Sequence, residues 1–156
     1  MSNTSHPRIV WHGLTRGEPD VVFGVGRKEV FLAHDRSLAE LYAGDSSDSS
    51  PTILEVEDLS VNPLVLATGE DYRDAWLTSG ADKCEGRFHP DVTAVFAQWA
   101  RLRGHDAIVV PASAFECEIG YTWAAGTIGD PQTIILDPTK IRVVSVDPPR
   151  AARYGR

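Results

Sequence analysis

The feature that most constrains the fold of this chain is a series of short β-branched runs, separated by Gly, Pro and Asp, with few stretches of helical spacing. Such a series is typical of an α+β domain. Because 156 residues is close to the commonest size of one domain, we expect a single domain over residues 1–156. The expected strands are Arg8–His12, Val21–Val25, Glu29–Ala33, Thr52–Val56, Pro63–Ala67, Ala107–Val110, Thr133–Leu136 and Arg142–Val146.

Three segments have the spacing of amphipathic helices. In Asp35–Gly44 a good N-cap residue precedes an apolar stripe, and a glycine is placed to end the helix. Pro90–Arg103 begins with a proline suited to a first turn and carries a longer apolar stripe, so it should pack on a sheet. A shorter helix is expected over Glu70–Leu77.

Charge and composition exclude several classes of protein. The net charge of −7 disfavours tight, sequence-independent binding to nucleic acid, which depends on Lys and Arg. No window approaches eighteen consecutive apolar residues and the N-terminus lacks the pattern of a signal peptide, so we expect a cytoplasmic protein without a membrane segment. Cys84 and Cys117 have no CxxC spacing and are expected to be reduced thiols, with no metal site. Residues 147–156 are expected to form a flexible tail.

The first expected strand ends in Trp11-His12 and is followed by Gly13. This segment places an imidazole beside a residue without a Cβ. A planar amide of a ligand could lie against the main chain at Gly13 and form hydrogen bonds with the backbone N–H and C=O of that glycine. From these residues alone, two interpretations stay open. The histidine either recognises a polar ligand or simply ends a strand before a turn.

Trp11-His12-Gly13 resembles the opening motif of the poly(ADP-ribose) polymerase-like branch of the ADP-ribosyltransferases. The next motif of that family is a strand leading into a short helix with a tyrosine, and the segment from Val30 to Tyr42 is similar to it. The third motif is a catalytic glutamate before a hydrophobic strand; Gln132–Ile141 is similar in pattern, with Gln132 at the glutamate position. The resemblance covers roughly Ile9–Val146. Parts of this range are similar to small bacterial and phage-associated members of the superfamily.

This resemblance implies the ADP-ribosyltransferase fold, an α+β fold with two small antiparallel or mixed sheets and a few flanking helices. It implies that the substrate is NAD⁺, with His12, Tyr42 and Gln132 as the catalytic set. His12 would bond the adenosine-side ribose, Gly13 the nicotinamide amide, and Tyr42 would stack on the nicotinamide ring with help from Phe31. Gln132 can bond the ribose 2′-hydroxyl, whereas only a glutamate would add a negative charge.

A long segment from Phe115 to Pro131 contains glycines and aromatic residues, which favours a loop that covers a ligand. Asp130 lies in it, at a position that relatives use to contact the acceptor. The implied activity is mono-ADP-ribosyl transfer to a protein or nucleic-acid acceptor, as a toxin or phage effector would perform. Two alternatives stay open: an NAD⁺ glycohydrolase, and a catalytically weak module that binds NAD⁺ or ADP-ribose.

Overall fold

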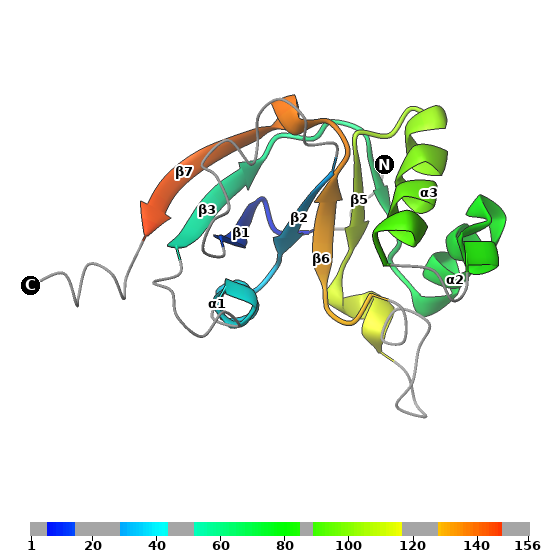
Figure 1. The fold of residues 1–156 in the computed structure, drawn as a ribbon, viewed down its shortest axis with the longest axis horizontal. Coiled ribbons are helices and arrows are strands. Elements are labelled where there is room, and N and C mark those ends of the chain that lie inside the picture. Colours follow the sequence, from blue (N-terminus) through cyan, green and yellow to red (C-terminus); the bar gives the residue numbers. More distant parts are fainter. Residues whose placement is uncertain (1–5, 15–28, 44–51, 85–88, 117–127, 148–156) are drawn as a thin grey trace, which may run out of the picture.

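A computed structural model of the chain describes residues 6–14, 29–43, 52–84, 89–116 and 128–147 (Figure 1). In these residues seven strands form one sheet in the order β4-β5-β6-β2-β1-β3-β7. The strands are β1 (Ile9–Leu14), β2 (Val30–Ala33), β3 (Thr52–Asp58), β4 (Pro63–Val65), β5 (Ala107–Val110), β6 (Gln132–Ile135) and β7 (Ile141–Asp147). The helices are α1 (Arg36–Ala43), α2 (Gly69–Ser79) and α3 (His89–Leu102), with 3₁₀ turns η2 (Ala81–Cys84), η3 (Ala112–Phe115) and η4 (Pro138–Lys140).

The α+β class is therefore confirmed, but the expectation of two small sheets is wrong for the described residues. The two halves of the sheet are joined where β2 pairs antiparallel with β6, from Val30 opposite Ile135 to Ala33 opposite Gln132. Only β4 and β5 run parallel, so the sheet is mixed. A hydrophobic run predicts a strand but not its distant partner, which is why the sequence could not reveal this joint.

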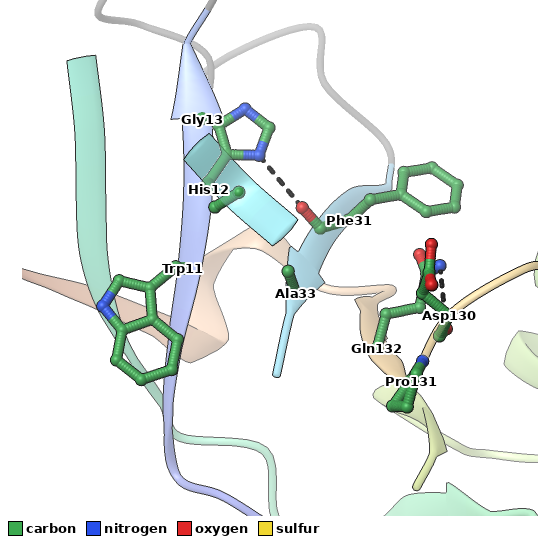
Figure 2. Close-up of a pocket in the computed structure, with 9 residues that line it drawn as sticks. Trp11, His12, Gly13, Phe31, Ala33, Asp130, Pro131 and Gln132 are labelled. Carbon is green, nitrogen blue, oxygen red and sulfur yellow. Dashed lines mark hydrogen bonds between the residues drawn. The ribbon is translucent and has the colours of Figure 1, made fainter. Parts of the chain in front are cut away.

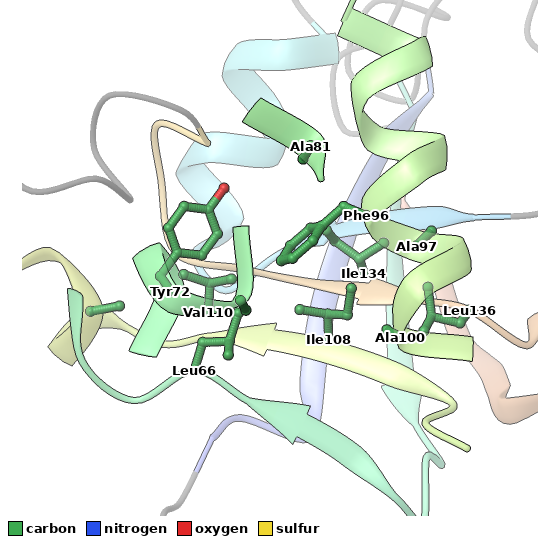
Figure 3. Packing of buried hydrophobic residues seen from close by; sticks show 12 residues of the cluster. Leu66, Tyr72, Ala81, Phe96, Ala97, Ala100, Ile108, Val110, Ile134 and Leu136 are labelled. Carbon is green, nitrogen blue, oxygen red and sulfur yellow. The ribbon is translucent and has the colours of Figure 1, made fainter. Parts of the chain in front are cut away.

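The larger part of the core lies between the sheet and the helices α2 and α3 (Figure 3). Phe96 and Ala100 of α3 are buried against Ile108 and Ile134, which belong to β5 and β6. The ring of Tyr72 in α2 meets Phe96 edge to face, with ring centroids 5.8 Å apart. Burial of each large apolar side chain stabilises the fold by about 2 kcal/mol, so the stripe of α3 fixes this helix on the sheet.

Helix α1 follows β2 directly and is capped by Asp35. The Asp35 carboxylate accepts from the backbone N–H of Ser37 at 3.0 Å, and its carbonyl oxygen accepts from Leu38 and Ala39. Ala39 is buried beside Ala33 and Ile53 in a small cluster of its own. Figure 1 shows the result, in which α1 lies at one end of β1 and β2, away from α2 and α3.

All three expected helices are present, and seven of the expected strands are present, with ends that differ by no more than two residues. The expected strand Val21–Val25 lies outside the described residues. The expected tail begins one residue too early, because Asp147 pairs with Ile53 as the last residue of β7. Residues 148–156 lie outside the described part of the chain.

Candidate functional site

The candidate site lies where β1 and β2 separate. Strand β1 pairs with β3 over six residue pairs, from Ile9 opposite Glu57 to Leu14 opposite Thr52. Between β1 and β2, by contrast, the described residues form a single pair, Trp11 opposite Ala33. Beyond that pair no ladder joins the two strands in the described residues, which leaves space for side chains and a ligand between them.

The imidazole of His12 occupies part of this space (Figure 2). Its Nδ1 lies 3.0 Å from the backbone carbonyl oxygen of Phe31. A carbonyl oxygen can only accept a hydrogen bond, so Nδ1 carries the proton and donates it. In the neutral ring Nε2 is then the acceptor nitrogen. The fold thus selects one tautomer of His12.

A cavity of about 110 Å³ lies beside His12. It is lined by residues of β1, β2, α1 and the start of β6, which are Trp11, His12, Gly13, Phe31, Ala33, Ala39, Asp130, Pro131 and Gln132. The structure therefore brings together five residues that the sequence singled out: His12, Gly13, Phe31, Asp130 and Gln132. Tyr42 belongs to α1, but its side chain lies outside the described residues, as do residues 117–127 of the expected ligand-covering loop.

Gln132 is buried, with an exposed fraction of 9%, and is held by the loop that precedes it. Its side-chain Nε2 donates to the carbonyl oxygens of Ile128 and Asp130, at 3.4 and 3.3 Å. Because both amide hydrogens have backbone acceptors, Oε1 is the atom of this amide that remains as an acceptor. Gln132 therefore offers its Oε1 atom, in a fixed orientation and without a charge, as a hydrogen-bond acceptor.

The turn that supplies these two carbonyl groups depends on Gly129. Its φ of 91° lies in the left-handed region, which costs a residue with a Cβ on the order of 1–2 kcal/mol. Gly129 stands between Ile128 and Asp130, so its conformation contributes to how their two carbonyl groups lie relative to each other. The glycine thereby positions the Gln132 amide.

Comparison of the chain with protein-family models, curated proteins and solved structures finds no match. The function is therefore inferred from the residues around the cavity. In the described part of the chain no group of three or more His, Cys, Asp or Glu side chains could hold a metal ion. None of the described helices has the length and apolar character needed to cross a membrane.

Several lining residues were not identified from the sequence. Ala33 and Ala39 are small and face the cavity from β2 and α1, and Pro131 fixes the backbone before Gln132. Trp11 adds an indole from β1 and packs on the Ala33–Ala39–Ile53 cluster. A small residue on a helix or strand carries no chemistry that a sequence pattern can distinguish, so no sequence signal identified the two alanines.

A second histidine, His34, lies at the end of β2. Its Nε2 is 2.7 Å from the hydroxyl oxygen of Thr133. Burial, which disfavours the imidazolium, and to a lesser extent the neighbouring His6 lower the pKa of His34 to about 4, although Asp58 opposes both effects. His34 is therefore neutral at pH 7. Its backbone N–H donates to the Pro131 carbonyl oxygen at 3.4 Å, next to the cavity.

Proposed function

We propose that this protein has the ADP-ribosyltransferase fold and is an NAD⁺-dependent mono-ADP-ribosyltransferase. One observation carries the proposal: the three segments that resemble the family's motifs lie on adjacent strands, β1, β2 and β6, and their residues line one cavity. Segments far apart in sequence need not meet in a fold. Their meeting supports a shared role for His12, Phe31 and Gln132.

The size of the cavity fits one end of the dinucleotide. A buried cavity of about 150 Å³ accepts a benzene ring in another protein, so about 110 Å³ is of the order of room for one ring. We assign the nicotinamide ring to it. Gly13 forms part of the wall without a Cβ, which suits the approach of a carboxamide to the main chain.

The tautomer of His12 fits a ribose hydroxyl. Since Nδ1 donates to Phe31, Nε2 can accept a hydrogen bond from a hydroxyl group. The Oε1 atom of Gln132 can accept from a second hydroxyl. With His12 on the adenosine-side ribose and Gln132 on the nicotinamide-bearing ribose, two fixed acceptors would hold the dinucleotide in one orientation, which lowers the entropic part of the barrier.

In the transfer step, a lone pair of the acceptor forms a bond to the ribose carbon that bears nicotinamide. The bond from that carbon to the nicotinamide nitrogen breaks, and its electron pair leaves with nicotinamide, which becomes neutral. The acceptor loses one proton. Positive charge develops on the ribose, and the carboxylate of Asp130, which lines the same cavity, would favour it.

Gln132 also favours a second candidate function, a module that binds NAD⁺ or ADP-ribose with little turnover. A neutral amide directed by two carbonyl groups adds no anion at the position where the family uses glutamate. Losing a fixed anion beside a developing cation lowers a rate by about 10²–10³. His12 and Gln132 would still bind NAD⁺ or ADP-ribose without this anion.

Incubation with NAD⁺ labelled in the adenylate part, with and without cell lysate, tests the proposal. Label on macromolecules supports transfer, whereas free ADP-ribose as the sole product indicates a glycohydrolase. NAD⁺ that binds but stays intact indicates the binding module. Failure to bind either NAD⁺ or ADP-ribose would contradict all three functions.

A further inference from the structure

A second, larger cavity shares Pro131 with the first. Its volume is about 630 Å³, which falls in the range of small-molecule sites. It is formed where the turn from β2 into α1 meets the N-terminal segment and the residues that follow β5. Pro131 lines both cavities, and Gln132 and Asp130 of the first cavity are its chain neighbours.

The walls of this second cavity are mostly apolar and rigid. Pro7, Pro111 and Pro131 have fixed φ angles, and Leu38 of α1 adds an aliphatic surface. Such walls suit the aliphatic stem or the flat face of a side chain. They offer little to a strongly hydrated group.

The polar groups in this cavity are acceptors or are neutral. Hydrogen bonds from the backbone N–H and hydroxyl of Ser37 lower the pKa of Asp35, which is ionised at pH 7. The Ser113 hydroxyl donates its proton to the carbonyl oxygen of Ala67, so toward a ligand it can act only as an acceptor. His34 is neutral at this pH. No Lys or Arg is among the described residues that line the cavity.

We propose that the second cavity docks an arginine side chain of a protein acceptor, beside the site of NAD⁺ cleavage. This inference rests on the proposed function. The Asp35 carboxylate complements a guanidinium, and the proline and leucine walls accept its planar, weakly hydrated face better than they accept an ammonium. The same carboxylate repels phosphate groups, which favours a protein over a nucleic acid as the acceptor.

With arginine as the acceptor, the balance of the transfer is simple. A guanidinium nitrogen forms the new bond to the ribose carbon, nicotinamide leaves with the electron pair of the broken bond, and one guanidinium proton passes to solvent. The product keeps a positive charge on the substituted guanidinium. Asp35 therefore stabilises the acceptor before and after the transfer.

Binding of N-acetylarginine methylamide, followed by NMR titration without NAD⁺, tests the docking site directly. Asp35→Asn removes the charge but keeps an oxygen that can accept from Ser37, so α1 keeps its cap. Asp71→Asn is the matched control, because Asp71 also accepts a backbone N–H at a helix start, in α2. We expect Asp35→Asn to weaken binding about tenfold and Asp71→Asn to leave it unchanged.

A second variant keeps the proposal testable if Asp35→Asn changes α1. Ala112 is exposed at the start of η3 and lines the cavity, so Ala112→Leu places a bulkier side chain in it and leaves the Asp35 charge in place. We expect this variant to lose the arginine probe, and N-acetyllysine methylamide to bind wild type more weakly than the arginine probe does. Equal binding of both probes, equal binding by Asp35→Asn and wild type, or no binding to wild type would overturn the proposal.

The same variants separate this proposal from the proposed function. Transfer to an arginine peptide should fall about tenfold in Asp35→Asn, while release of nicotinamide to water stays unchanged. Peptide transfer that is equal in Asp35→Asn and wild type would overturn the docking site alone. Failure of wild type to bind NAD⁺, with the arginine probe still bound through Asp35, would overturn the proposed function alone.

Discussion

His12 donates from Nδ1 to the backbone carbonyl oxygen of Phe31, at 3.0 Å, across the point where β1 and β2 separate. A side chain here takes the place of a backbone ladder bond. The bond orients the imidazole and fixes its tautomer, and it satisfies a carbonyl group that the separation of the strands would otherwise expose. The same separation creates the cavity that we assign to nicotinamide.

The first prediction concerns Gln132→Glu. A glutamate adds an anion beside the developing cation, so NAD⁺ cleavage per folded molecule should rise about tenfold or more. The new carboxylate faces the carbonyl oxygens of Ile128 and Asp130, which should lower the free energy of unfolding by about 1–3 kcal/mol. Nicotinamide release and urea unfolding measure the two effects.

The stability cost of Gln132→Glu should depend on pH. Repulsion by the two carbonyl groups raises the pKa of the new carboxyl in the folded state, so the protonated form is favoured there. The variant should therefore be most stable below the unfolded pKa of about 4.3 and should lose stability as pH rises. Gln98→Glu, on the exposed face of α3, is the control and should show no such loss. Equal behaviour of the two variants would contradict the placement of the Gln132 amide.

The second prediction concerns the turn before β6. Gly129→Ala should cost on the order of 1–2 kcal/mol of stability, because alanine resists a φ of 91°. Gly80→Ala is matched, since Gly80 has a φ of 84° at the end of α2, and an added Cβ meets nothing within 4 Å at either glycine. Both variants should unfold at similar urea concentrations. Only Gly129→Ala should also weaken NAD⁺ binding, and a similar loss in Gly80→Ala would point to a general effect of stability.

The third prediction concerns His34. Its pKa in the folded protein is about 4, below the value of about 6.5 expected in the unfolded chain. The unfolded chain therefore binds the proton first, and stability should fall as pH falls from about 6.5 to 4, then level off for this group. After allowance for partial exposure, the loss is on the order of 2 kcal/mol.

Urea unfolding of wild type and His34→Gln between pH 4 and 7 measures this contribution. The variant should lose the part of the pH dependence that comes from His34. His105→Gln, which alters a histidine bonded to the Asn62 carbonyl after α3, should keep it. If wild type and His34→Gln respond equally to pH, His34 is not the group that opposes protonation.

Much of the fold could be predicted from the sequence. The apolar stripe of α3 and the capping residue of α1 are local signals, and both helices lie where those signals place them. The joint between β2 and β6 was not predictable, since strand pairing over a long separation depends on the packing of the whole sheet. For this reason we expected two small sheets, whereas the described strands form one sheet.

Some of the residues around the cavity could be singled out from the sequence, but their geometry could not. His12, Phe31 and Gln132 were singled out by residue type and order, and they do line one cavity. The direction of the Gln132 amide depends on the backbone at Gly129, and the low pKa of His34 depends on its burial. Neither property is encoded in a local pattern.

Calorimetric titration with NAD⁺ tests the central claim most directly. Wild type should bind, and His12→Ala should bind more weakly by about 1–2 kcal/mol, roughly ten- to thirtyfold, with an unchanged circular dichroism spectrum. Tyr42→Ala is expected to weaken binding as well, through loss of stacking. His105→Ala is the control. The Nδ1 atom of His105 lies 3.1 Å from the carbonyl oxygen of Asn62, and His105 does not line the cavity. Unchanged affinity in both His12→Ala and Tyr42→Ala, or no binding by wild type, would contradict the account.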